Sequence, residues 1–426
     1  MVPRPPLRAN REFWWMWIGQ AGSTIGSHSS AIAIPLLILG ITQSPSQAGL
    51  VGSVSTAALV TLLPVAGVIA DQVNRRQLMR WCDTGRALTM AALSITLLWG
   101  RPPLAELIGI VLINGSLTAF FTAAHSGALR QVVNPTDLPT AVARTQAYRQ
   151  AAAIGGPPLG GLLYGIARLL PFLTDALSYL ISYLAITAIK IPLQTQHRQL
   201  EAAPLRRRLL DGSRWILNQP FLRAGCLYAA ALCALQPALV LTVIVRATTT
   251  GASSFAIGAI FALTGAGGVI GALASPQICR RWPPGHVLLT IGALWASGIP
   301  LLALTTQPTL LGLILAALGF AAPSANTVII SYQMATTPDH LQGQAYAAIT
   351  LITGIPASLG SLTSGALLAS IGSTNTVIVL TATATATVQI GSTSVTLRTS
   401  GHHTNPQHQQ PPCTKHDTDH HTPMDP

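Results

Sequence analysis

Residues 67–76 (Gly-Val-Ile-Ala-Asp-Gln-Val-Asn-Arg-Arg) place an acid between a glycine and two arginines, where one apolar segment ends and the next begins. Gly67 and Asp71 are one helical turn apart and share a helix face. Gly67 would let a neighbouring helix approach closely, and Asp71 can pair with an arginine or a helix N-terminus. Together with Arg75 and Arg76, this segment predicts charged contacts that hold two halves of a protein in one state and release them in another.

Three more ionisable groups lie within apolar segments, where such side chains are costly and usually functional. Asp175 lies about two turns into its segment, and removal from water favours a protonated carboxyl group, so Asp175 is our first candidate for a proton carrier. A structural hydrogen bond to a neighbouring serine or to the backbone explains its presence equally well. Asp83 and Arg86 are three residues apart and can pair on one helix. We expect them to form a gate with Asp71 and Arg75 near the membrane surface.

Two arginines and a histidine are candidates for a substrate cavity. Arg149 either faces the cavity, where it would bind an anionic substrate or hold Asp175, or reaches the lipid headgroups; the headgroup role is expected for Arg144. His28 is either a proton-sensitive group or, as is more common, a hydrogen-bonded packing residue. Residues 401–426 hold six of the eleven histidines. Histidine-rich tails can bind nickel, zinc or copper, but the spacing specifies no site, so no metal is assigned.

The composition places these groups in a membrane. The chain has 426 residues, of which 8% are charged, and a mean hydropathy of +0.49, whereas soluble proteins carry about 25% charged residues. The net charge of +12 lies mostly in short loops, so membrane topology explains it and no nucleic-acid partner is expected. The first apolar segment is long and leads into further ones, which argues against a cleavable signal peptide. The five scattered cysteines predict neither a disulfide framework nor a zinc site.

A helix needs about 20 mostly apolar residues to cross a membrane, and the hydropathy pattern predicts twelve such spans. They are expected at 13–40, 47–70, 78–99, 103–125, 138–165, 169–191, 221–245, 253–275, 285–305, 309–331, 341–370 and 375–393. The last span is rich in Thr and Ala and is the weakest. An isolated strand cannot satisfy its backbone in lipid, so a helix is the only workable structure if this segment spans. The expected fold class is therefore an all-α, polytopic membrane protein.

The distribution of cations supports this count. Of the 24 Lys and Arg residues, 18 fall in the segments placed inside, only Arg101, Arg168 and Arg246 fall outside, and the other three lie within spans. Because cytoplasmic loops are enriched in Lys and Arg, both termini are expected to be cytoplasmic.

The chain divides into four parts. We expect an N-terminal six-helix bundle (1–191), a cytoplasmic linker with an amphipathic helix on the inner membrane surface (192–220), a C-terminal six-helix bundle (221–393) and a disordered histidine-rich tail (394–426). The halves resemble each other. Asn134-Pro-Thr-Asp-Leu precedes span five and Thr337-Pro-Asp-His-Leu precedes span eleven, and the run from Gly271 to Arg281 echoes 67–76 with Ser275 in place of the acid. Parallel six-helix repeats are known in transporters.

Two motifs resemble signatures of the major facilitator superfamily. Segment 67–76 resembles the loop between its second and third helices, although Asn74 replaces the usual glycine; asparagine tolerates the left-handed backbone that such a turn would use. In span five, Gly155-Gly-Pro-Pro-Leu-Gly-Gly161 resembles the antiporter signature of superfamily exporters, thought to shape the cavity and block leak. The matching residues are Gly156, Pro157, Gly160 and Gly161. The alternative is a packing kink without chemistry, since prolines kink helices and glycines allow tight contact.

Three other stretches resemble the drug:proton antiporter branch of that superfamily, which includes macrolide-efflux and siderophore-export proteins. They are Arg11-Glu-Phe-Trp-Trp, Asp83-Thr-Gly-Arg86 and Asp175-Ala-Leu-Ser-Tyr. The resemblance covers most of residues 11–190 and is thinner in the second half. The family often has an acid after Gly26, where this chain has Ser27 and then His28.

This resemblance implies two six-helix bundles around a central cavity and export of a small amphipathic or hydrophobic compound (a drug, macrolide, siderophore or similar) from a bacterial cytoplasmic membrane. Protons would exchange for substrate as the two halves rock, with the proton gradient as energy source and no cofactor. Protonation of Asp175 would bias the states. The residues expected to lock the outward-open state are Asp71, Arg75, Arg76, Asp83 and Arg86, and Gly67 is expected to take part in the same conformational change.

Other functions remain open. The alternatives within transport are a proton-coupled uptake symporter and a uniporter, and a non-transporting metal sensor that uses the histidine-rich tail is a further one. The sequence holds no G-x-x-x-x-G-K-[ST] phosphate loop and nothing like a nucleophile triad, so an enzyme is the least favoured class. The superfamily is usually monomeric, and a monomer is expected.

Overall fold

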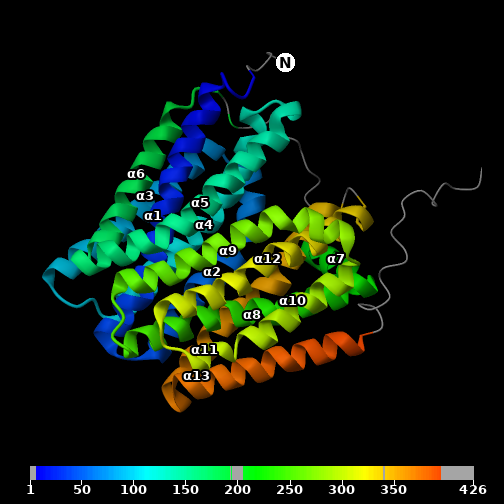
Figure 1. The fold of residues 1–426 in the computed structure, drawn as a ribbon. Helices are drawn as coiled ribbons and strands as arrows, with labels where there is room; N and C mark the ends of the chain where they lie inside the picture. Colours follow the sequence, from blue (N-terminus) through cyan, green and yellow to red (C-terminus); the bar gives the residue numbers. More distant parts are fainter. Residues whose placement is uncertain (1–5, 192, 194–204, 339–340, 395–426) are drawn as a thin grey trace, which may run out of the picture.

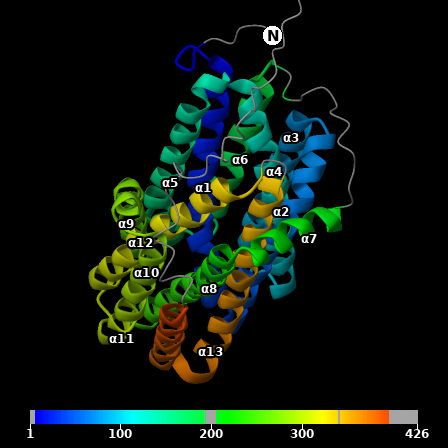
Figure 2. The ribbon, with the colours of Figure 1, turned by 90° about the vertical axis from the view of Figure 1, so that its right-hand side faces the viewer.

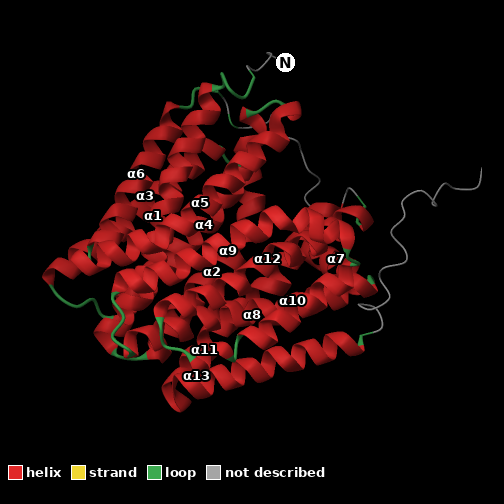
Figure 3. Cartoon of the chain, in the orientation of Figure 1, coloured by secondary structure: helices red, strands yellow, loops and turns green. Residues whose placement is uncertain are grey.

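The computed structural model describes residues 6–191, 193, 205–338 and 341–394. All regular secondary structure in these ranges is helical (Figure 3), which agrees with the predicted all-α class.

The first half of the chain forms six long helices and one short turn of helix. They are α1 (Arg11–Thr42), α2 (Pro45–Gln72), α3 (Arg75–Trp99), α4 (Leu104–Val132), η1 (Pro135–Asp137), α5 (Leu138–Ile166) and α6 (Leu170–Ala188). Side-chain caps begin the first three: Asn10, Ser44 and Asn74 each accept a hydrogen bond from a backbone N–H in the first turn of the helix that follows.

The second half begins with a shorter helix and then repeats the long ones. Its helices are α7 (Leu205–Asn218), α8 (Pro220–Thr249), α9 (Ser254–Arg281), α10 (Pro284–Gly298), α11 (Leu301–Leu304), α12 (Pro308–Thr336) and α13 (Gln342–Thr393). The chain bends sharply inside α13 at Gly372, whose φ of 78° and ψ of 174° suit glycine, because it has no Cβ to clash. The predicted spans 341–370 and 375–393 are the two arms of α13.

The helices account for the twelve predicted spans. By length and hydropathy, nine of the described helical segments can cross a membrane, with α10 and α11 counted as one. Two long helices, α3 and α5, fall outside that group, and both carry charged residues within their length. With these two, and with α13 taken as two arms, the described part of the chain holds twelve spans. The weakest predicted span is helical to Thr393.

The helices form two bundles (Figures 1 and 2). In the N-terminal bundle, α1 packs against α5 and α6, α2 against α4, and α3 against α4 and α6. In the C-terminal bundle, α8 packs against α13, α9 against α12, and α10 against α12 and α13. Two helix pairs make the most extensive contacts between the bundles, α2 with α13 and α5 with α9, and α8 also touches α1 and α2.

The bundles touch at one end and separate at the other (Figure 1). We call the end where α1 begins and α2 finishes the near end, and the opposite end the far end. At the far end, a Cβ on Gly49 of α2 would lie 2.5 Å from the Ser361 carbonyl oxygen of α13. At the near end, large apolar side chains of the facing helices α5 and α9 are exposed, among them Val142 and Leu273. The structure is therefore closed at the far end and open at the near end.

A helix does form within the predicted linker. In α7, the Trp215 indole Nε1 donates to Thr337 Oγ1 at 3.2 Å, and the backbone at Gly212 lies against that of Gln344. This helix therefore packs against the near end of the C-terminal bundle. The histidine-rich tail from 395 onward lies outside the described residues.

Candidate functional site

A cavity of about 340 Å³ lies between the bundles. The N-terminal bundle lines it with hydroxyl and amide groups interspersed with apolar side chains such as Ile34, Val51 and Met90, and α8 of the C-terminal bundle lines it with apolar groups alone. The polar lining residues are Ser27, Ser30, Ser55, Thr56, Asn114, Thr118, Tyr179 and Ser361, and those from α8 are Pro237, Val240, Leu241 and Ile244. A concave site with an apolar wall and a few polar groups is typical of small-molecule binding.

Asp175, the predicted proton carrier, is buried directly behind the wall of this cavity. Its Oδ2 accepts a hydrogen bond from Ser30 Oγ at 2.5 Å, and its Oδ1 accepts one from Ser178 Oγ at 3.3 Å. A Cβ on Gly26 would lie 2.8 Å from Asp175 Oδ1, so glycine at this position lets α1 approach the carboxyl group. The structure thus confirms hydrogen bonds to neighbouring serines, and it also places this acid one hydroxyl away from the cavity.

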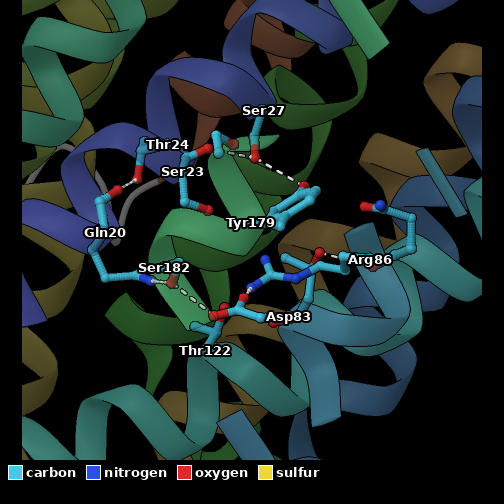
Figure 4. A network of polar contacts seen from close by, with 12 residues as sticks. Gln20, Ser23, Thr24, Ser27, Asp83, Arg86, Thr122, Tyr179 and Ser182 are labelled. Atoms are coloured by element: carbon cyan, nitrogen blue, oxygen red, sulfur yellow. Dashed lines mark hydrogen bonds and ion pairs between the residues drawn. The ribbon is translucent and has the colours of Figure 1, made fainter. Parts of the chain in front are cut away.

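Asp83 and Arg86 form the predicted ion pair inside the N-terminal bundle (Figure 4). Both side chains are buried. Ser182 Oγ donates to Asp83 Oδ2 at 2.7 Å, and Gln20 Nε2 donates to Ser182 Oγ at 3.0 Å, so the carboxylate joins α3 to α6 and α1. Buried charges of this kind need such partners because they have lost their hydration.

Two aromatic rings complete the surroundings of Arg86. Its guanidinium carbon lies 4.3 Å from the Phe121 ring centroid and 4.4 Å from that of Tyr179, both within cation–π range. The Tyr179 hydroxyl lies 3.0 Å from Ser27 Oγ, and Tyr179 also lines the cavity. Tyr179 therefore connects the buried ion pair to the cavity wall (Figure 4).

The expectation that Asp83 and Arg86 join Asp71 and Arg75 in one gate near the membrane surface is not met. The first pair lies within the bundle core, while the second bridges the end of α2 and the start of α3. There, Arg75 Nη2 donates to Asp71 Oδ1 at 2.8 Å, and the Asp71 side chain is 55% exposed. The reason is depth: Asp83 is two turns further along α3 than Arg75, and its side chain faces α6 rather than the surface.

The other residues of the 67–76 segment also have defined contacts. Arg76 Nη2 donates to the Ile191 carbonyl oxygen at 2.6 Å, which fastens the start of α3 to the chain beyond α6. Asn74 has φ −64° and ψ 108°, so the expected left-handed backbone is wrong. Instead, Asn74 Oδ1 accepts from the backbone N–H groups of Arg76 and Gln77 at 3.1 and 3.3 Å, and asparagine serves this turn as a helix cap.

The expected close approach of a helix at Gly67 is absent from this structure. A Cβ placed on Gly67 would meet no described atom within 4 Å. The physical reason is that the bundles are apart at the near end. The echo of this glycine in the second half, Gly271, does lie against a backbone, that of Phe320, and Ser275 Oγ donates to Thr327 Oγ1 at 3.0 Å.

The antiporter-like motif of α5 lies at a crossing of three helices. Gly156 and Gly160 face α1 at His28 and at the Ser29 backbone, and Gly161 faces α9 at the Ser254 backbone. The Pro157 carbonyl lies against Gly258 of α9. The motif therefore supplies tight packing at the far end, both within the N-terminal bundle and between bundles, and its role in coupling stays a prediction.

The three remaining candidates lie apart from Asp175. Arg149 is exposed and is not among the described partners of Asp175. The Arg144 guanidinium carbon lies 5.2 Å from the Trp14 ring centroid. His28 packs where α1 crosses α5, which agrees with a packing role.

Sequence reasoning did not single out several residues that the structure brings to the site. Ser30 and Tyr179 connect the cavity to the buried acids, and Asn114 lines the cavity. Buried His125 stacks on Phe121, with ring centroids 6.0 Å apart. A hydroxyl four residues after Gly26 was the one available signal for Ser30, but serines are frequent in all these helices. No group of three or more metal-ligating side chains occurs among the described residues.

The fold and the central site define a membrane transporter, and the sequence profile of the Major Facilitator Superfamily matches residues 16–361. The chain belongs to this superfamily and is therefore a transporter rather than an enzyme. Among curated proteins, the chain is similar to the enterobactin exporter EntS of Shigella flexneri, with 26% identity over 352 residues, 79% of this chain and 80% of that protein.

Solved structures show the same fold. The nucleoside transporter NupG superposes with a TM-score of 0.75 at 14% identity, over 89% of this chain and 98% of that one. A bacterial homologue of the human lysosomal transporter Spinster, in an inward-facing and unoccupied conformation, superposes with a TM-score of 0.68 at 14% identity, over 92% and 96% of the two chains. The twelve-helix, two-bundle arrangement predicted from the sequence is that of this superfamily.

Proposed function

We propose that this protein exports a small amphipathic or hydrophobic compound across a bacterial cytoplasmic membrane in exchange for protons, acting as a monomer with both termini in the cytoplasm. The observation that carries the proposal is the position of Asp175, a buried acid separated from the central cavity by the single hydroxyl of Ser30. This proximity gives a direct route by which the occupancy of the substrate site can affect the protonation of the acid, and such coupling is reciprocal. The similarity to an enterobactin exporter supports the outward direction.

The helix contacts support alternating access. Gly67 follows Gly49 on α2 by eighteen residues, which is five turns of 3.6 residues, so both lie on the same helix face. On the antiparallel α13, Gly343 precedes Ser361 by the same interval. Gly49 meets Ser361 in the present structure, whereas Gly67 and Gly343 each face open space. When the bundles rock to close the near end, Gly67 would meet Gly343.

Charge placement agrees with this second state. Asp71 lies one turn beyond Gly67 and would then reach the first turn of α13, which begins at Gln342. The positive end of a helix dipole lies at its N-terminus and attracts an anion. With the near end facing the cytoplasm, the present structure is the inward-open state, and Asp71 with Arg75 would hold the outward-open state.

Proteoliposomes with an enclosed pH indicator would test the proposal. Chloramphenicol, a small, uncharged amphipathic compound, should exchange for protons with the wild type when it is added against an imposed proton gradient. Asp175→Asn should abolish the exchange without preventing insertion. Counterflow with opposite gradients separates export from uptake, and deletion of 401–426 should leave the flux intact. Transport without proton movement would instead indicate a uniporter.

A further inference from the structure

The central cavity has two chemically different walls. Helices α1, α2 and α4 present hydroxyl and amide groups among apolar side chains, whereas α8 presents apolar groups alone, those of Pro237, Val240, Leu241 and Ile244. None of the described lining residues carries a charge. A ligand that fits both walls has one face with hydrogen-bonding groups and one apolar face.

The uncharged lining restricts the ligand further. An ion that enters such a cavity loses hydration without gaining an opposite charge, which costs several kcal/mol in general, whereas a neutral group can exchange water for the hydroxyls of the wall. The volume of about 340 Å³ lies at the lower end of the range of roughly 300–1,000 Å³ known for ligand pockets. The cavity therefore suits a small, uncharged molecule.

Ser30 belongs to the cavity and to the buried acid at once. Its one hydroxyl proton points to Asp175 Oδ2 at 2.5 Å, with the Ser27 carbonyl as a more distant acceptor at 3.2 Å. A serine hydroxyl has two lone pairs besides its proton. These lone pairs can accept a hydrogen bond from a ligand in the cavity while the proton still serves the carboxylate.

The other groups around Asp175 do not duplicate this link. On α6, Ser178 Oγ bonds to Asp175 and Tyr179 lies one turn away. On α3, Arg86 is near enough to attract Asp175 electrostatically, but its guanidinium is paired with Asp83. Ser27 also lines the cavity and lies near the Asp175 carboxyl group, but its hydroxyl donates to the Ser23 carbonyl oxygen at 2.9 Å and lies 3.0 Å from the Tyr179 hydroxyl. Ser30 is the cavity-lining residue whose hydroxyl donates directly to this carboxyl group at 2.5 Å.

We infer that the cavity binds an uncharged compound whose hydrogen-bond donor reaches Ser30 Oγ, and that Ser30 makes this binding favour the ionised form of Asp175. A donor to Ser30 Oγ polarises its O–H group and strengthens the hydrogen bond to the carboxylate. The O–H bond of protonated Asp175 breaks, its proton passes to water in the cavity, and the carboxylate remains bonded to Ser30 and Ser178. Substrate entry then releases a proton, as antiport requires. This inference rests on the proposed function because it specifies the substrate and the coupling residue of the same site.

A matched pair of probes tests the inference on the purified full-length protein. Ethyl 3,4-dihydroxybenzoate is small, uncharged and carries donor hydroxyls; ethyl 3,4-dimethoxybenzoate has the same skeleton without donors. Titration calorimetry in two buffers of different ionisation enthalpy, across the pH range in which the protein is stable, gives both affinity and protons released. The dihydroxy probe should bind about tenfold more tightly, the equivalent of one good hydrogen bond, and should release protons.

Four variants separate coupling from folding. Ser30→Ala should still bind the dihydroxy probe but release no proton, and Ser30→Thr, which keeps the hydroxyl, should restore release. Asp175→Asn should bind without release. Ser94→Ala is the control, because Ser94 is equally buried but its hydroxyl bonds to a carbonyl of its own helix; it should behave as the wild type.

Three results would overturn the inference: proton release by Ser30→Ala equal to that of the wild type, equal affinity for the two probes, or binding of neither probe. These results are distinct from a failure of the proposed function. Wild-type protein that binds and releases protons in micelles but moves nothing in proteoliposomes would refute transport by exchange and leave the Ser30 link standing. Proton-coupled flux that persists in Ser30→Ala would support transport by exchange and refute the Ser30 link.

Discussion

The buried ion pair Asp83–Arg86 leads to our most quantitative prediction. Replacing Asp83 by asparagine keeps the shape of the side chain and removes its charge. Arg86 cannot respond by losing its own proton, since guanidinium stays protonated in proteins. The variant therefore leaves a full positive charge between two aromatic rings with no ionised partner in contact.

The magnitude follows from the burial of the pair. Removing one partner of a buried ion pair costs about 3–5 kcal/mol, and the hydrogen bond from Ser182 at 2.7 Å is weakened as well. For comparison, Asp71→Asn breaks a pair whose carboxylate is 55% exposed, and an exposed pair contributes roughly 0–1 kcal/mol. Asp83→Asn should therefore lower the free energy of unfolding several times more than Asp71→Asn does. Asp71→Asn should impair transport while leaving the fold nearly as stable as the wild type.

A double variant distinguishes an uncompensated charge from lost packing. In Asp83→Asn with Arg86→Met, an unbranched side chain occupies the space between the rings and no charge remains. This double variant should be more stable than Asp83→Asn alone, despite the loss of cation–π contacts worth about 0.5–2 kcal/mol each. Denaturant unfolding in detergent micelles, followed by tryptophan fluorescence, measures all three variants.

Equal stability of Asp83→Asn and Asp71→Asn would refute this reasoning, because the difference in burial would then have no energetic consequence. A double variant less stable than Asp83→Asn would show that packing, not charge, dominates at Arg86.

Three further predictions concern helix contacts. In a background without native cysteines, the double variant Gly67→Cys, Gly343→Cys should form a disulfide only when the near end closes. Cross-linking that does not change with substrate or pH would contradict the proposed second state. Gly160→Val should reduce folded yield, measured by size-exclusion chromatography, because its side chain would meet the Ser29 backbone, which cannot rotate away; a normal yield would show that α1 and α5 can separate there. Trp215→Phe should lower the free energy of unfolding by about 0.5–1.5 kcal/mol, because one hydrogen bond to the end of α12 is lost. An unchanged free energy of unfolding would mean that this hydrogen bond from α7 contributes no stability.

Local patterns in the sequence were enough for the elements and for contacts within one helix. Apolar runs of the length of a bilayer gave the twelve spans, because a chain in lipid must satisfy its backbone within each helix. The spacing of three residues gave the Asp83–Arg86 pair, because this interval brings side chains together on any α-helix. Asp71 and Arg75 meet instead across the turn between α2 and α3.

Contacts between helices were decided by the tertiary structure. Nothing near Asp175 in the sequence identifies Ser30, 145 residues away, as its partner, and the depth of Asp83 became visible only when α6 and α1 lay beside α3. Gly67 and Gly49 are equivalent in the sequence of α2, yet one faces open space and the other touches α13, because the relative tilt of two bundles is a property of the whole molecule. The sequence by itself determined which segments span and which ionisable groups they carry. Only the tertiary structure decided which of those groups meet the cavity, since that depends on how helices distant in the chain rotate and pack.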